Sequence, residues 1–83
     1  MKMSPKYFAE ALSEEYNRKI ETRDVEKAWK KMGLTYLDEN NSPKLTDEGK
    51  ARGGQVTQSG FAFSFDYDSL KKEVIDQIPR KKR

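Results

Sequence analysis

The chain has 83 residues, of which 34% are hydrophobic and 37% are charged, and its formal net charge is +3. This length suits one small domain with a single core. The absence of Cys excludes disulfides and thiolate metal sites, and the absence of His removes the usual side chain for acid–base chemistry near neutral pH. We therefore expect a protein that is not an enzyme and that binds no metal or cofactor.

The positive charge is concentrated at one end of the chain. Residues 80–83 carry four positive charges, and subtracting these from +3 leaves the rest of the chain at −1. A nucleic-acid surface on the body must therefore be local. No apolar stretch is long enough to span a membrane, and the first five residues lack the apolar core of a signal peptide. We expect a cytoplasmic protein with no membrane partner.

A first helix is predicted over residues 5–16. Ser4 can cap it and Pro5 suits its first turn, because the missing N–H of proline has no partner there. The apolar residues recur at helical spacing: Phe8, Ala11, Leu12 and Tyr16. We expect Asn17 to end this helix in a left-handed conformation and Ile20 to enter the core.

A second helix is predicted from Thr22, with Gly33 as its stop. Its apolar stripe consists of Val25, Ala28, Trp29 and Met32. Positive charges occupy the other faces: Arg23, Lys27, Lys30 and Lys31. Trp29 is expected to anchor the core, and Asp24 suits the positive end of the helix dipole. The basic faces are typical of a helix that reads nucleic acid, although an ordinary solvated helix can carry the same charge.

A β-hairpin is predicted after this helix. Residues 34–37 have the composition of a short strand, residues 38–43 are turn formers, and residues 44–45 begin the return. Its tip carries Asp38 and Glu39. A hairpin that enters a DNA groove is ordinarily basic, so this acidic tip argues against such a role.

A short helix is predicted over residues 47–52. Thr46 can cap it, and Gly53 and Gly54 can end it. Residues 55–60 then form a polar, glycine-bounded loop, which would suit either a phosphate contact or an ordinary surface.

The last part of the body is predicted to be a strand followed by a helix. Residues 61–67 alternate in polarity, with one aromatic face: Phe61, Phe63, Phe65 and Tyr67. Asp68 or Ser69 should cap the final helix, and Pro79 should stop it. The apolar stripe of that helix comprises Leu70, Val74 and Ile78. The basic residues beyond it are expected to be disordered.

Three segments resemble the small winged-helix domains of phage antirepressor and related phage or prophage regulatory proteins. They are VEKAWKKMGL at residues 25–34, KLTDEGKARG at residues 44–53, and the aromatic strand with its closing helix at residues 61–78. The resemblance implies a compact fold with a wing. It also implies a role in phage gene control or interference with a host protein, in the cytoplasm of a bacterial or phage-infected cell. The connection before the second helix lacks the turn glycine common in helix-turn-helix units.

The order of elements predicts a mixed α/β (α+β) fold. It is a small winged helix-turn-helix domain over residues 1–78, with three main helices and a short β-hairpin or sheet. The first and final helices should pack on the apolar stripe of the second helix, and residues 79–83 should form a disordered basic tail.

The first functional hypothesis is a noncatalytic regulator that binds double-stranded DNA. Base readout would fall to Thr22, Arg23 and Lys27, near the start of the second helix. The complete set of predicted DNA-binding residues is Thr22, Arg23, Lys27, Lys30, Lys31, Lys50, Arg52, Gln55, Arg80, Lys81, Lys82 and Arg83.

The alternative hypothesis is a protein-binding module of phage origin that acts on a host protein. The contact would then involve Tyr36, Asp38 and Glu39. A homodimer formed through a sheet edge at residues 61–67 is compatible with either hypothesis.

Overall fold

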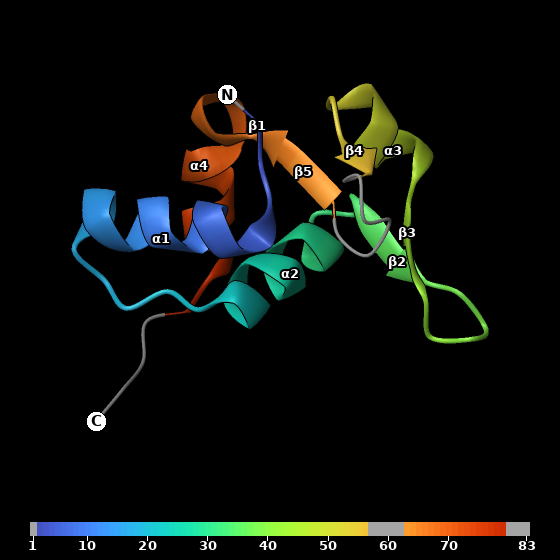
Figure 1. Ribbon diagram of the computed structural model, residues 1–83, viewed down its shortest axis with the longest axis horizontal. Coiled ribbons are helices and arrows are strands. Elements are labelled where there is room, and N and C mark those ends of the chain that lie inside the picture. The colour runs from blue at the N-terminus through green and yellow to red at the C-terminus, as the bar shows by residue number, and fades with distance from the viewer. Residues whose placement is uncertain (1, 57–62, 80–83) are drawn as a thin grey trace.

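The computed structural model describes residues 2–56 and 63–79, and it confirms the α+β class (Figure 1). The described helices are α1 (Pro5–Tyr16), α2 (Thr22–Lys31), α3 (Asp47–Ala51) and α4 (Tyr67–Gln77). The described strands are β1 (Lys2–Met3), β2 (Thr35–Leu37), β3 (Pro43–Leu45), β4 (Gln55–Val56) and β5 (Phe63–Asp66). No helix in this part of the chain is both long and apolar enough to cross a membrane. Identity as a winged-helix domain stays a prediction.

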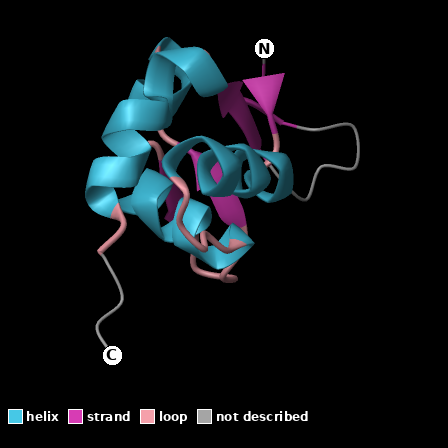
Figure 2. Cartoon of the chain, turned by 90° about the vertical axis from the view of Figure 1, so that its left-hand side faces the viewer, coloured by secondary structure: helices cyan, strands magenta, loops and turns pink. Residues whose placement is uncertain are grey.

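The strands form two separate antiparallel units. One is a sheet in the order β1–β5–β4, and the other is the predicted hairpin of β2 and β3. Figure 1 shows α1 and α4 to the left of β5, with α3 and the hairpin to its right, and Figure 2 shows the same arrangement from the left-hand side. Because β1 and β4 flank β5, the prediction of a free sheet edge is wrong for residues 63–66, while residues 61–62 lie outside the described residues. A homodimer stays a prediction, without this edge as its basis.

The core lies where α1, α2 and α4 pack together against β5, as the stripes of the helices predicted. Val25, Ala28 and Trp29 bury one face of α2. The Trp29 ring centroid lies 4.6 Å from that of Phe65 and 5.5 Å from that of Phe8, with the latter pair edge to face. Such aromatic contacts add to the burial energy and fix the rotation of α2 about its axis.

The link between α1 and α2 is held without a glycine. Asn17 adopts the predicted left-handed conformation (φ 52°), which Asn tolerates better than most residues. Ile20 is buried as predicted, and its N–H donates a hydrogen bond of 3.0 Å to the Ser13 hydroxyl. Ser4 is the N-cap of α1, although its hydroxyl makes no capping hydrogen bond.

Three local predictions are corrected. α4 is capped by Asp66, whose carboxylate accepts a 3.0 Å hydrogen bond from the Ser69 N–H, and not by Asp68 or Ser69. Tyr67 begins that helix and does not extend the strand. In the predicted loop, the first two residues form β4, and residues 57–60 lie outside the described residues. The strand β4 depends on pairing with β5, which a local pattern does not encode, whereas the Asp66 cap is a contact between residues three apart in the sequence.

α3 is docked tightly against the end of α2. The Thr46 side chain caps α3 by accepting a 2.9 Å hydrogen bond from the Gly49 N–H, as predicted, and it donates one of 2.5 Å to the Gly33 carbonyl. Gly49 is buried, and a Cβ atom there would lie 2.1 Å from the Leu34 carbonyl oxygen. Only glycine fits at this position, so the Thr46–Gly49 spacing in the KLTDEGKARG segment has a structural reason.

The substitution Gly49→Ala should destabilise the protein by about 1–3 kcal/mol, because the methyl group would meet backbone that cannot rotate away. This sign is diagnostic, since Gly→Ala inside a helix ordinarily stabilises it. Urea unfolding followed by circular dichroism measures the effect. The matched control is Lys50→Ala at the next, exposed position, for which we expect a change within about 0.5 kcal/mol. A Gly49→Ala protein as stable as the parent would contradict the close packing of α3.

Candidate functional site

The exposed face of α2 gathers the basic residues that the sequence singled out. Arg23, Lys27 and Lys30 follow one another at helical spacing, and Lys31 lies beside Lys30. All four side chains are exposed. Since the opposite side of the helix is buried in the core, this basic face has a fixed direction relative to the rest of the molecule.

The acidic residues at the start of α2 are occupied by the helix itself. Asp24 accepts a 2.9 Å hydrogen bond from the Glu21 N–H, and the Glu21 side chain accepts one from the N–H of Asp24, which completes a capping box. Arg23 makes an exposed ion pair of 3.4 Å with Glu21. Within residues 2–56 and 63–79, Lys27, Lys30 and Lys31 make no ion pair. Their charges are therefore available to an anionic ligand.

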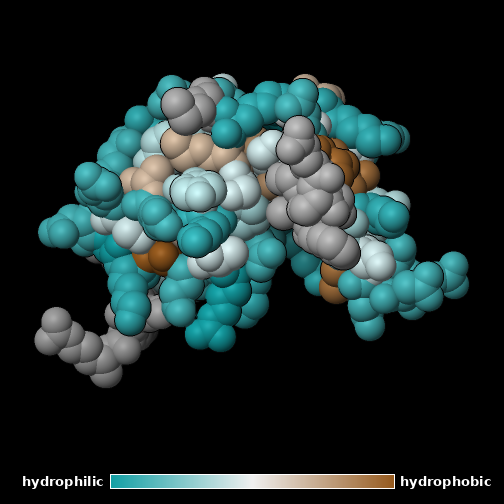
Figure 3. Space-filling view, viewed as in Figure 1, coloured by the Kyte–Doolittle hydropathy of each residue, from teal (hydrophilic) through white to brown (hydrophobic). Residues whose placement is uncertain are grey.

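One side of this basic face borders a recess against the hairpin, here named the α2–hairpin groove. Its volume is about 280 Å³. Figure 3 shows a largely hydrophilic face that is indented between the α2 region and the projecting hairpin. The residues that line the groove are Pro5, Arg23, Glu26, Lys27, Trp29, Lys30, Thr35, Tyr36, Leu37, Pro43 and Phe63. Its surface is mainly apolar, with the charged side chains coming from α2.

The other side of the basic face borders a recess against the end of α4, here named the α2–α4 groove, of about 540 Å³. Lys27 and Lys30 line both grooves, so they stand on the ridge between them. The remaining lining residues of the α2–α4 groove are Asp24, Lys31, Gln77, Ile78 and Pro79. Pro79 directly precedes the four basic residues at 80–83 in the sequence.

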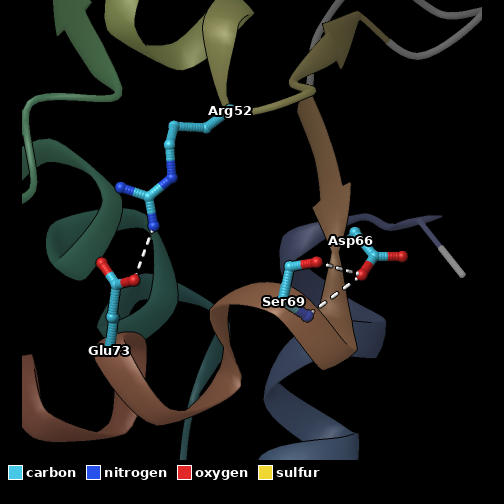
Figure 4. Close-up of polar contacts among 4 residues, drawn as sticks. All are labelled: Arg52, Asp66, Ser69 and Glu73. Atoms are coloured by element: carbon cyan, nitrogen blue, oxygen red, sulfur yellow. Dashed lines mark hydrogen bonds and ion pairs between the residues drawn. The ribbon is translucent and has the colours of Figure 1, made fainter.

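The predicted residues on α3 and β4 do not join this surface. Arg52 forms a 2.6 Å ion pair with Glu73 of α4, which ties α3 to the helical core and raises the pKa of the guanidinium (Figure 4). Lys50 and Gln55 are exposed but line neither groove. A phosphate contact by Arg52 stays a prediction, and the phosphate would have to compete with Glu73 for the guanidinium. The residues Arg80, Lys81, Lys82 and Arg83 lie outside the described residues.

The three residues predicted for the protein-binding alternative do different things in the structure. Tyr36 is 47% exposed and lines the α2–hairpin groove. Asp38 instead builds the hairpin turn, because its carboxylate accepts hydrogen bonds from the N–H groups of Asn40 (2.8 Å) and Ser42 (2.9 Å). These bonds, chiefly the one from Ser42, lower the pKa of Asp38. Glu39 is exposed at the tip.

Several groove residues were not identified as site residues from the sequence, and Leu37 and Pro43 are two of them. Leu37 and Pro43 face each other in the register of the hairpin, and both line the α2–hairpin groove. Leu37 is 48% exposed. Its half-exposed state depends on where the hairpin lies beside α2, and no local pattern encodes that position.

A cluster of titratable groups joins α1 to α4 elsewhere in the molecule. The Tyr67 hydroxyl donates a 2.8 Å hydrogen bond to Glu15, and Lys71 makes a 2.8 Å ion pair with the same carboxylate. The hydrogen bonds from Lys71 and Tyr67 lower the pKa of Glu15, and burial and Glu15 raise the pKa of Tyr67. Perturbed groups can mark reactive sites. Here each is paired with another, and none lines either groove, so their role is to link the two helices.

No group of three carboxylates or other metal-binding side chains converges within the described ranges. A comparison with known proteins finds no matching family model, no matching curated protein and no matching solved structure. The arguments for a function therefore come from the surface of α2 and its two grooves.

Unfolding experiments at high pH should test the contact between α1 and α4 that Tyr67 and Glu15 make. The raised pKa of Tyr67 means that the folded state holds the phenol proton more tightly than the unfolded state does. Its stabilising contribution is therefore complete below the ordinary Tyr pKa of 10.0 and is lost as the pH rises above it. We expect Tyr67→Phe to remove this part of the alkaline loss of stability in chemical unfolding curves. The exposed control Tyr7→Phe should retain it, and an identical pH profile for both variants would contradict the assignment.

Proposed function

We propose that this protein is a noncatalytic regulator that binds double-stranded DNA through the exposed face of α2. The observation that carries the proposal is the set of three exposed lysines on α2 without carboxylate partners in the described part of the chain. Lysines arranged in this way can replace the counterions of DNA phosphates. The sequence at 80–83 would add phosphate contacts next to the α2–α4 groove.

The start of α2 is the part best suited to base readout. Thr22 and Arg23 are exposed in its first turn, and Lys27 lies one turn further along the same side. Docked helices commonly contact base edges near their N-terminal end, while lysines further along hold phosphates. In this arrangement Lys30 and Lys31 position the helix and do not select sequence.

In the proposed complex the hairpin does not take the usual role of a wing, because Glu39 at its exposed tip would repel phosphate. Asp38 adds negative charge at the same turn. We therefore propose that α2 and the basic sequence at the C-terminal end hold the DNA, with the hairpin turned away from the duplex. The proposed setting is the cytoplasm of a bacterial or phage-infected cell, as the resemblance to phage regulators implies.

The second candidate function is a protein-binding module that acts on a host protein. The observation in its favour is the apolar lining of the α2–hairpin groove, together with the exposed Tyr36 and Leu37. A complex of this kind would survive salt that removes DNA, because apolar burial is not screened by ions. A pull-down from host extract at high salt separates the two candidates.

The double substitution Lys27→Ala and Lys30→Ala should weaken binding to a labelled duplex in fluorescence anisotropy. If each lysine neutralises one phosphate, the slope of log affinity against log salt should fall by about two. The control is Lys44→Ala with Lys72→Ala, which removes the same charge from exposed positions outside both grooves and outside the predicted DNA-binding set, and it should change the slope less.

The contribution of the terminal cations is measured with a chain that ends at Pro79. We expect it to bind more weakly but to keep its dependence on Lys27 and Lys30. Complete loss of binding in the shortened chain, with no effect of the two lysines in the full chain, would show that α2 is not the interface.

A further inference from the structure

We propose that the α2–hairpin groove binds a short acidic peptide segment by taking one of its apolar side chains. The carboxylates of the segment would face the basic residues of α2. The site shares Arg23, Lys27 and Lys30 with the proposed DNA surface, and it does not require the chain to bind DNA. The proposal rests on the shape of the groove, its lining and the charges at its rim.

The wall of the groove on the hairpin side is apolar and accessible. Leu37 is 48% exposed and pairs with Pro43 across the hairpin, so the two residues form a continuous apolar surface. Among the described residues, four large hydrophobic side chains are exposed, and two of them, Tyr36 and Leu37, line this groove. Solvent-exposed apolar side chains gathered at one recess favour a binding site over a random surface.

Buried aromatic residues also contribute to the lining, and one of them has an unused donor. Trp29 and Phe63 both line the groove. The indole Nε1 of Trp29 is the one buried side-chain polar atom in the described residues that has no hydrogen-bond partner. Buried donors are ordinarily paired. Because Trp29 is only 1% exposed, a bound peptide carbonyl would reach this N–H only if the side chains around the indole moved aside.

The charge at the rim selects an acidic partner. Arg23, Lys27 and Lys30 contribute three positive charges to the groove, and Glu26 contributes one negative charge. Lys27 and Lys30 have no carboxylate partner in the described residues. Acidic residues on either side of an apolar anchor would therefore gain ion pairs that a neutral or basic peptide lacks.

A peptide suits this groove better than nucleic acid does. A duplex presents a broad polar surface, with no protruding apolar group to fill a recess of about 280 Å³. An unstacked base would bring polar edges into a lining whose uncharged hydrogen-bonding side chains are those of Thr35, Tyr36 and Trp29. An apolar amino-acid side chain leaves no such groups unsatisfied.

The single tryptophan of the chain gives a direct readout. The full-length protein is titrated with a capped peptide that has one phenylalanine flanked by glutamates, and Trp29 fluorescence is recorded. We expect a saturable change. A matched peptide with serine in place of phenylalanine should bind at least about tenfold more weakly, since losing one buried apolar side chain is worth that factor. A peptide with lysines in place of the glutamates should also bind more weakly, because its charges would face Arg23, Lys27 and Lys30.

The matched protein variants are Leu37→Ser and Val56→Ser. Both remove an exposed strand side chain, 48% and 56% exposed respectively, but only Leu37 lines the groove. We expect Leu37→Ser to lower the peptide affinity about tenfold and Val56→Ser to leave it within about twofold. Thermal unfolding of both variants checks that each is folded, and Lys27→Gln gives an independent loss of affinity if Leu37→Ser unfolds.

Three results would overturn the proposal. The first is a lack of saturable change in fluorescence confirmed by a lack of binding heat in calorimetry. The second is equal affinity for the acidic peptide in the Leu37→Ser and Val56→Ser proteins. The third is a Leu37-dependent change in Trp29 fluorescence with single-stranded or duplex DNA but not with the acidic peptide, which would assign the groove to nucleic acid.

Discussion

The packing of Trp29 between Phe8 and Phe65 determines which side of α2 faces the solvent. Because the apolar stripe of α2 is buried in the core, the residues on the opposite face of the helix must point to the solvent. Lys27 and Lys30 consequently stand on a ridge with a groove on each side. The proposed DNA surface and the proposed peptide site both follow from this one constraint, because each uses the same ridge from a different side.

The position of the hairpin depends on a second set of contacts, between α3 and the end of α2. Thr46 bonds both the Gly33 carbonyl and the Gly49 N–H, and Gly49 lies directly on the backbone of Leu34. Arg52 then ties the end of α3 to Glu73 on α4. These contacts fix the strands on either side of the hairpin turn, so the α2–hairpin groove is part of the packed structure.

The distribution of charge explains how a body with a net charge of −1 can present a basic surface. Several carboxylates accept hydrogen bonds from backbone N–H groups: Asp24 at the start of α2, Asp38 in the hairpin turn, and Asp66 at the start of α4. Glu15 and Glu73 pair with cations that lie away from the grooves of α2. Net charge is thus a poor guide to this molecule, because the placement of each acid decides which lysines remain unpaired.

The sequence by itself determined the main helices and their buried faces. The stripes of α1, α2 and α4 and the turn residues Asn17 and Gly33 act within a few residues, so periodicity and capping chemistry were sufficient. Only the tertiary structure decided the short strands β1 and β4, the pairing of Arg52 with Glu73, and the groove that Leu37 and Pro43 line. Each of these joins residues far apart in the chain, and their contacts exist only after the core has formed.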